Sequence, residues 1–136
     1  MKAKQYLEQV YFLDQCINDK LLEIERLRDL SLTISKADMS KERVQTSNKP
    51  DIIGDVIPAL VDLKEEINRK IDEYVDKKRE IESNIEKLTD EQLKVLLLKR
   101  YIHLKSWKQI SLDLCYSYVH TIRLHNKALK AFDEVY

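Results

Sequence analysis

The sequence is poor in the two residue types that most often form turns. Its 136 residues include 1 glycine and 2 prolines. Sheets and Rossmann-like folds need many tight turns, which recruit glycine for positive φ and proline for its fixed φ. The scarcity of both therefore argues against these architectures. A chain this poor in glycine and proline, and rich in Glu, Lys, Leu and Ile, is predicted to be an all-α protein with long helices and few breaks.

Cysteines and long apolar runs are also scarce. Cys16 and Cys115 lie far apart, without the spacing of a disulfide framework or a structural zinc site. Glu8 and Asp14 interrupt the first apolar run, so it does not resemble a signal peptide. No stretch approaches the roughly 18 apolar residues of a membrane span. These features predict a cytoplasmic protein that does not enter a membrane.

No motif of a catalytic or cofactor site is present. The sequence has neither a glycine-rich phosphate loop nor an HExxH motif, and its carboxylates are spread along predicted helix surfaces. The three histidines lack the spacing of a metal-ligand set. We therefore expect no enzyme activity, no cofactor and no bound metal.

The first two thirds of the chain carry two narrow apolar stripes. Residues 3–34 predict one long helix, with apolar residues at steps of three and four: Val10, Leu13, Ile17, Ile24, Leu27 and Ile34. The spacing is lost in residues 35–50, which predicts a loop. It returns in residues 51–88, at Leu60, Leu63, Ile67, Ile71, Tyr74, Ile81, Ile85 and Leu88. Because Pro58 is tolerated in a first turn, the second helix is expected to begin near it.

A narrow stripe flanked by charge needs a partner helix. An antiparallel hairpin, in which the two long helices fold back on each other across the loop, satisfies this need. Packing against a second copy of the chain is the alternative. Near Leu88 the pattern changes: Thr89 and Gln92 form a predicted capping box, and a helix that is apolar over a wider arc follows. We therefore predict two domains, a helical hairpin in residues 1–88 and a compact domain in residues 89–136.

Two further helix starts predict a helix-turn-helix in the second domain. Ser106 can cap a short helix that contains Trp107, and Ser117 can cap a longer one that reaches about Phe132. A short helix, a tight break and a longer helix form the helix-turn-helix pattern. Cys115 stands in the break where glycine is frequent, which predicts a slightly strained or differently shaped turn.

The last helix is expected to have two faces. Thr121, Leu124, Ala128 and Phe132 would pack inward, on one face of the helix. The other face has the chemistry of major-groove readers, in which arginine pairs with guanine, asparagine with adenine, and apolar side chains meet thymine methyl groups. The predicted DNA-contacting residues are Ser117, Tyr118, Val119, Ile122, Arg123, Asn126, Lys105, Lys108, Lys127 and Lys130. The simpler interpretation is an ordinary solvated helix face.

The net charge of zero is the sum of a basic C-terminal part and an acidic N-terminal part. Residues 89–136 contain 8 Lys and Arg residues against 5 Asp and Glu residues, a net charge of +3. Residues 1–88 contain 16 against 19, a net charge of −3, so the two parts cancel. A basic C-terminal end fits a nucleic-acid partner better than the overall net charge suggests.

Short runs in the C-terminal part match two known patterns. The first comprises Leu93 to Tyr101, Trp107-Lys108-Gln109-Ile110, Ser117 and Ala128-Leu129, and it resembles the C-terminal promoter-reading domain of bacterial sigma factors. The second comprises Arg100-Tyr101-Ile102, Lys105-Ser106-Trp107, Tyr116-Ser117, His125 and Ala128-Leu129. It resembles small phage and prophage proteins of Gram-positive bacteria related to RinA- and ArpU-type late-gene regulators.

This resemblance extends to Ile24-Glu25-Arg26-Leu27-Arg28 and to the loop segment from Glu42 to Ser47. It implies a sigma-like helix-turn-helix after an N-terminal helical region, and a transcription regulator in the cytoplasm of a bacterial host. Thr121 stands where the family usually has a larger aliphatic residue. The implied partners are double-stranded DNA and RNA polymerase, with a homodimer or higher oligomer formed through the N-terminal helices.

Two other functions fit the same sequence. One is a DNA-packaging subunit of the small-terminase kind, which also couples a helix-turn-helix to helical oligomerisation. The other is an interaction protein whose helix-turn-helix does not contact DNA.

Overall fold

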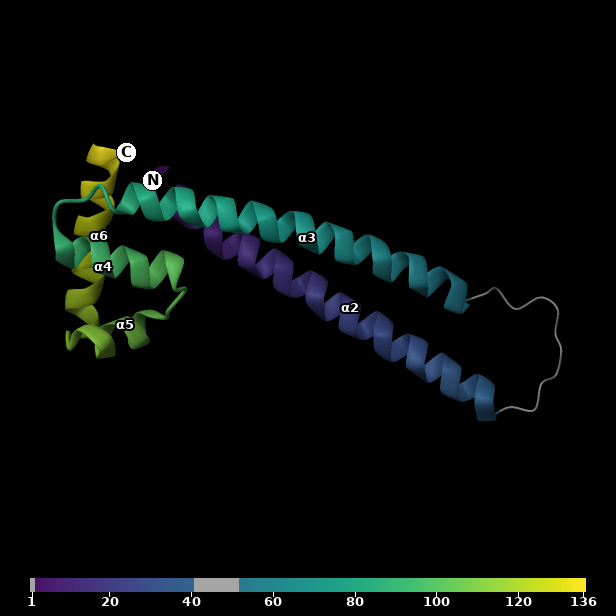
Figure 1. Cartoon of the computed structure of the whole chain (residues 1–136). Coiled ribbons are helices and arrows are strands. Elements are labelled where there is room, and N and C mark those ends of the chain that lie inside the picture. The colour runs from purple at the N-terminus through teal and green to yellow at the C-terminus, as the bar shows by residue number, and fades with distance from the viewer. Residues whose placement is uncertain (1, 41–51) are drawn as a thin grey trace. The chain divides into compact units, whose positions relative to one another are not determined.

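A computed structural model describes the backbone of residues 2–40 and 52–136 and the side chains of residues 2–33 and 56–136 (Figure 1). Every regular element in these ranges is helical, which confirms the all-α prediction. The elements are α1 (Lys2–Leu7), α2 (Gln9–Ser40), α3 (Ile52–Ile85), α4 (Glu91–Leu97), the π-helix η1 (Leu98–Ile102), α5 (Trp107–Leu114) and α6 (Tyr118–Val135). The chain divides into a hairpin unit, residues 15–72, and a compact unit, residues 1–14 and 73–136.

In the hairpin unit, α2 and α3 pack antiparallel, as predicted (Figure 1). The buried residues come from the two predicted stripes and their continuation: Ile17, Ile24, Val56 and Ile67. Lys20 fills a gap in the α2 stripe, and its Nζ lies 2.7 Å from a carboxylate oxygen of Glu66. The lysine stem thus covers apolar surface while its ammonium meets a charge on the facing helix. Lys20 of α2 and Glu66 of α3 therefore lie at the same level of the hairpin.

The helix ends differ from the sequence predictions. Helix α2 continues to Ser40, so the predicted loop 35–50 is wrong at its start. The helix continues although the apolar spacing ends, because lysine, alanine and methionine have high intrinsic helix propensity. Helix α3 begins at Ile52, not near Pro58, which lies inside the helix and costs it one backbone hydrogen bond. The segment from Glu42 to Ser47 lies outside the described residues.

The predicted first helix is also interrupted. Helix α1 ends at Leu7 and α2 begins at Gln9, with Glu8 between them. The N–H of Glu8 still donates to the carbonyl oxygen of Lys4 at 2.9 Å, and the N–H of Phe12 donates to that of Glu8 at 3.1 Å. The interruption is therefore a local distortion of one nearly continuous helix.

The compact unit has a single core to which every one of its elements contributes. The fully or nearly fully buried members are Ala3, Leu7, Val10, Ile81, Ile85, Leu88, Leu93, Leu96, Leu97, Tyr101, Ile102, Ile110, Ala128, Leu129 and Phe132. The ring of Tyr6 in α1 stacks on that of Tyr136 after α6, with centroids 4.4 Å apart. The boundary predicted near residue 88 falls inside this unit, at the turn between α3 and α4.

Helix α4 begins one residue later than predicted. Its N-cap is Asp90, whose Oδ1 accepts from the N–H of Gln92 at 3.0 Å, so the predicted capping box of Thr89 with Gln92 is wrong. Threonine and aspartate both cap helices well, so the sequence offers two adjacent starts. Starting at Glu91, the helix buries Leu93 together with Leu96 and Leu97.

The helix-turn-helix prediction is confirmed by α5 and α6, including both caps. The side chain of Ser106 accepts from the N–H of Gln109, and that of Ser117 accepts from the N–H of His120. Between the helices, Cys115 adopts the left-handed conformation with φ 57° and ψ 38°. Across residues 2–40 and 52–136, we find no helix that combines the length and apolarity needed to cross a membrane.

Candidate nucleic-acid interface

The inward face of α6 fixes which of its side chains point to solvent. Thr121, His125, Ala128, Leu129 and Phe132 are buried against the compact unit's core. Thr121 is fully buried, and its hydroxyl donates to the carbonyl oxygen of Ser117 at 2.9 Å. A small side chain at this position thus allows the start of α6 to be held by hydrogen bonds as well as by packing.

The opposite face of α6 brings most of the predicted contact residues together. The exposed members are Tyr118, Val119, Arg123, Asn126, Lys127 and Lys130, and Ile122 is half-buried at the edge. Val119 is 59% exposed, so its apolar side chain is open to solvent beside Arg123. No ion pair joins Arg123, Lys127 or Lys130 to another residue in the described part of the chain. Their charges are therefore free to meet a ligand.

Two of the predicted lysines behave differently from each other. The Nζ of Lys105 lies 2.7 Å from Oδ2 of Asp113, and Lys99 lies 3.6 Å from the same oxygen. Hydrogen bonds from Lys105 and Gln109, with the charge of Lys99 nearby, lower the pKa of the Asp113 carboxyl. Lys108, by contrast, is exposed and forms no ion pair with another described residue. Within this described part of the chain, Lys108 on α5 therefore carries an unpaired positive charge, whereas the charge of Lys105 is paired with that of Asp113.

The turn before α6 is tied to the rest of the compact unit through Tyr116. The side-chain amide of Gln92 in α4 donates to its hydroxyl, and its ring packs edge-on against His120, with centroids 4.8 Å apart. The N–H of Tyr116 donates to the carbonyl oxygen of Ser111 at 3.0 Å, which closes the end of α5. These contacts fix the direction in which α6 leaves the turn, and hence the position of its outward face.

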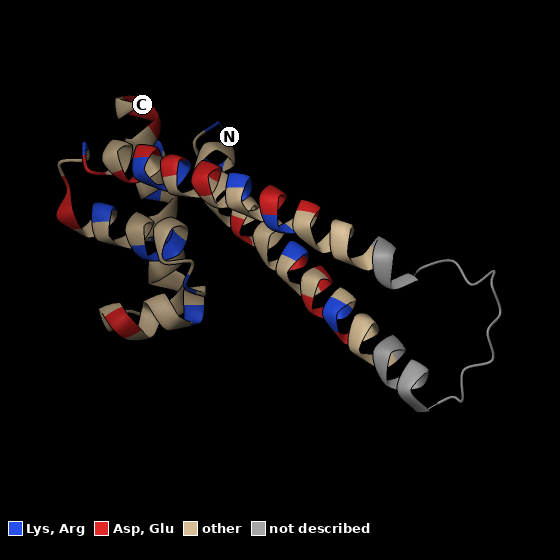
Figure 2. Ribbon diagram, turned by 45° about the vertical axis from the view of Figure 1, so that its right-hand side comes forward, with Lys and Arg blue, Asp and Glu red and all other residues tan. Residues whose placement is uncertain are grey.

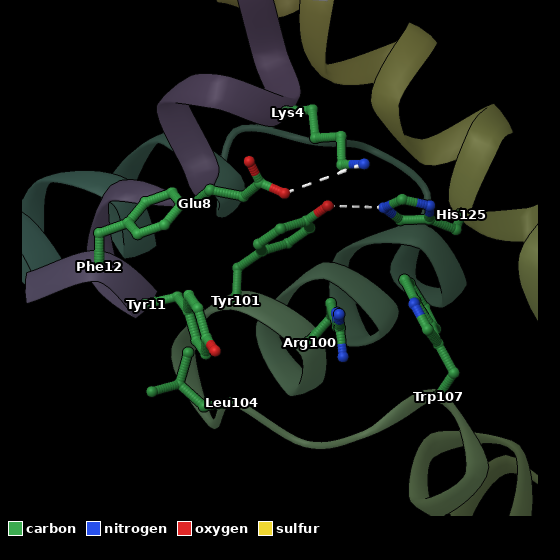
Figure 3. A pocket seen from close by; sticks show the side chains of 9 residues that line it. All are labelled: Lys4, Glu8, Tyr11, Phe12, Arg100, Tyr101, Leu104, Trp107 and His125. Atoms are coloured by element: carbon green, nitrogen blue, oxygen red, sulfur yellow. Dashed lines mark hydrogen bonds and ion pairs between the residues drawn. The ribbon is translucent and has the colours of Figure 1, made fainter. Parts of the chain in front are cut away.

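Behind α6 lies a polar and aromatic cluster that the sequence did not predict (Figure 3). The hydroxyl of Tyr101 lies 2.7 Å from Nε2 of His125, and the rings of Trp107 and His125 meet edge-on with centroids 4.4 Å apart. The guanidinium of Arg100 lies over the Trp107 ring at 4.6 Å and donates to the carbonyl oxygen of Lys105 at 3.0 Å. Together with Lys4, Glu8, Tyr11, Phe12 and Leu104, these residues line a cavity of about 290 Å³.

Burial keeps both partners of the central hydrogen bond neutral. Burial, reinforced by the positive charges of Lys4 and Arg100, lowers the pKa of His125 to about 4. Burial, with the negative charge of Glu8 nearby, raises the pKa of Tyr101 to about 12. The bond therefore joins an un-ionised phenol to a neutral imidazole, as expected for a packing role of His125 on α6.

Sequence reasoning had partial signals for these features. His125 lies four residues after Thr121 and three before Ala128, a spacing that puts it on the inward face of α6, and Trp107 packs against the core. Nothing in the spacing of Tyr101 and His125 indicated that their polar atoms would meet, because the two residues lie on different elements. Within the described ranges, no group of three or more His, Cys, Asp or Glu side chains could hold a metal ion.

Comparison with known protein families gave one match. Residues 33–133 match the model of DUF1492, described as a protein of unknown function. The chain belongs to the DUF1492 family. Comparisons with curated proteins and with solved structures gave no match. The family match covers both α3 and the helix-turn-helix, so the two regions belong to one family pattern, but its description assigns no activity to either.

Proposed function

We propose that this DUF1492 protein is a sequence-specific regulator of phage or prophage genes that binds double-stranded DNA, similar to the RinA and ArpU types. The observation that carries the proposal is the outward face of α6, where Val119, Arg123 and Asn126 are exposed together. Arginine and asparagine can each make two hydrogen bonds to a base edge, and an apolar side chain beside them suits a thymine methyl group.

The surroundings of this face support the proposal. The first turn of α6 is capped by Ser117, and Tyr118 beside it is 56% exposed. Backbone N–H groups at a helix start attract phosphates. Lys108, Lys127 and Lys130 add exposed charge on the flanks, where a DNA backbone would pass. The net charge of +3 in residues 89–136 favours the same partner.

The hairpin unit has a separate role in this proposal. Acidic and basic residues are mixed along the described parts of α2 and α3 (Figure 2), a pattern that differs from the one-sided basic charge typical of DNA-binding surfaces. A single helix-turn-helix usually binds weakly, and two copies reading two half-sites bind more tightly. We assign self-association, and contact with RNA polymerase in the host cytoplasm, to the helices that precede the helix-turn-helix.

Selection of bound sequences from a random pool of double-stranded DNA tests the proposal. The selected site is then used with Arg123→Ala and with Arg79→Ala, which removes an exposed arginine from α3 instead. We expect Arg123→Ala to lose about 1–3 kcal/mol and to relax one position of the site. Arg79→Ala should bind as the unmodified chain does.

Three outcomes would contradict the proposal. Absence of salt-sensitive binding to any sequence in the pool would exclude a DNA-binding role. Binding that Arg123→Ala and Asn126→Ala leave unchanged would mean that α6 does not read the bases. A ring-shaped oligomer that binds only a packaging site would favour the packaging subunit over the regulator.

A further inference from the structure

The hairpin unit exposes a row of large apolar side chains. Leu21 and Leu32 on α2 are 46% and 60% exposed, and Ile57, Val61 and Ile71 on α3 are 55%, 50% and 40% exposed. On α3, Ile57 follows the buried Val56, and Val61 follows the half-buried Leu60 of the inner stripe, the stripe that packs α2 against α3. Ile71, predicted on that inner stripe, is instead exposed and follows the half-buried Lys70. On α2, Leu21 and Leu32 follow the half-buried Lys20 and Ser31. One residue is a rotation of about 100° around a helix. Because α2 and α3 run antiparallel, the same forward step turns both helices toward one common side of the hairpin.

A rotation of about 100° between the inner stripe and the exposed row suits the geometry of a four-helix bundle. In such a bundle each helix contacts two neighbours, and the two contact directions are separated by about a right angle. The inner stripe supplies the contact within the hairpin. The row of Leu21, Leu32, Ile57, Val61 and Ile71, here called the second stripe, lies where a second hairpin would pack.

The second stripe of α3 is symmetric when its order is reversed. Along α3 in the hairpin unit, this face presents Ile57, Val61, Lys64, Asn68 and Ile71, of which Lys64 and Asn68 are polar. Reversal about Glu66 exchanges Val61 with Ile71 and Lys64 with Asn68. A two-fold interface requires this property, because each position must suit its symmetry mate.

We infer that the second stripe binds a second copy of this chain, with the α3 helices antiparallel and the two-fold axis beside Glu66. Val61 of each copy then meets position 71 of the other, and Lys64 meets position 68. Apolar pairs thus lie outside a central polar layer, and a polar layer of this kind fixes the register of packed helices. The Lys20–Glu66 ion pair places Leu21 at the level of the axis, where its own symmetry mate adds an apolar contact.

Charges beside the axis fit the same arrangement. Lys64 and Glu65 are both exposed, and neither forms an ion pair with another residue that the structure describes. Position 65 lies three residues, about one helical turn, from position 68, so Lys64 of one copy can reach Glu65 of the other while it faces position 68. Two symmetry-related pairs of opposite charge would therefore form across the interface.

Sedimentation of the full chain without DNA tests this inference. We expect a dimer whose dissociation constant rises at least tenfold in Val61→Lys. Leu22→Lys is the matched control, because Leu22 is 62% exposed on α2 but lies outside the second stripe. Helix content measured by circular dichroism should be the same in all three proteins.

A charge exchange tests the register. Lys64→Glu and Glu65→Lys should each weaken self-association, whereas an equal mixture of the two should form a mixed dimer close to the original in strength. Three outcomes would overturn the inference. The chain could be monomeric at every concentration, or Leu22→Lys could raise the dissociation constant as much as Val61→Lys does. The mixture of Lys64→Glu and Glu65→Lys could also self-associate no more tightly than either variant alone. None of these outcomes depends on DNA binding, so failure of the proposed function would leave this result intact.

Discussion

The hydroxyl of Tyr101 in η1 and Nε2 of His125 in α6 lie 2.7 Å apart, inside the compact unit. Their residues are 4% and 7% exposed, so neither polar atom has bulk water as a ready alternative partner. This bond joins the element before the helix-turn-helix to the inward face of α6. It therefore helps to hold the helix whose outward face carries Arg123 and Asn126.

Tyr101→Phe should reduce the free energy of unfolding by about 1–3 kcal/mol, because it leaves a buried imidazole nitrogen without its partner. Chemical denaturation measures the change. Tyr116→Phe is the matched control: it removes a hydroxyl whose hydrogen bond to Gln92 is exposed, so its cost should be smaller. Equal losses in the two variants would show that burial does not strengthen the Tyr101–His125 bond.

The stability of the compact unit should fall as the pH drops from about 6.5 toward 4. The folded-state pKa of His125, about 4, lies below the ordinary value of 6.5. In this window the unfolded chain binds a proton that the folded chain does not, so acid favours unfolding. His125→Gln should flatten this part of the stability profile. A folded-state imidazole pKa near or above 6.5, measured by NMR, would contradict the assignment.

The sequence predicted features that depend on local signals. Ser106 and Ser117 were identified as caps because capping needs only the residues within one turn, and both predictions are confirmed. The sequence does not distinguish Asp90 from the adjacent Thr89, because both residue types cap helices well; in the structure it is the Asp90 side chain that accepts from the N–H of Gln92. The Tyr101–His125 bond could not be predicted, since it depends on how two elements pack and not on either one alone.

Ser117 should have separable roles in folding and in the proposed DNA contact. Ser117→Ala removes the side-chain acceptor of the His120 N–H and should destabilise the chain by about 1 kcal/mol. Ser117→Asp retains a good cap but adds a negative charge at the start of α6, so it should preserve stability and weaken DNA binding. Thermal unfolding and DNA titration distinguish the two effects. Ser106→Asp, at the start of α5, shows whether any added charge has the same effect.

The turn at Cys115 should tolerate glycine better than a branched residue. Its φ of 57° lies in the left-handed region, which costs an L-residue roughly 1–2 kcal/mol. Cys115→Gly relieves that strain but adds freedom to the unfolded chain, so a net gain of about 0.5 kcal/mol is expected. Cys115→Val should be destabilising, because a β-branched side chain fits this conformation poorly. Denaturation midpoints give both values, and a stabilising Cys115→Val would refute the explanation.

Asp113 should limit the attraction of α5 to DNA. Its carboxylate contacts Lys105 at 2.7 Å and Lys99 at 3.6 Å, so both ammonium groups are partly neutralised. Asp113→Asn should release them, strengthen binding to all sequences alike and steepen the salt dependence. For the same reason Lys108→Ala should weaken binding more than Lys105→Ala. Titrations at several salt concentrations measure these slopes, and a shallower slope in Asp113→Asn would place α5 away from the phosphates.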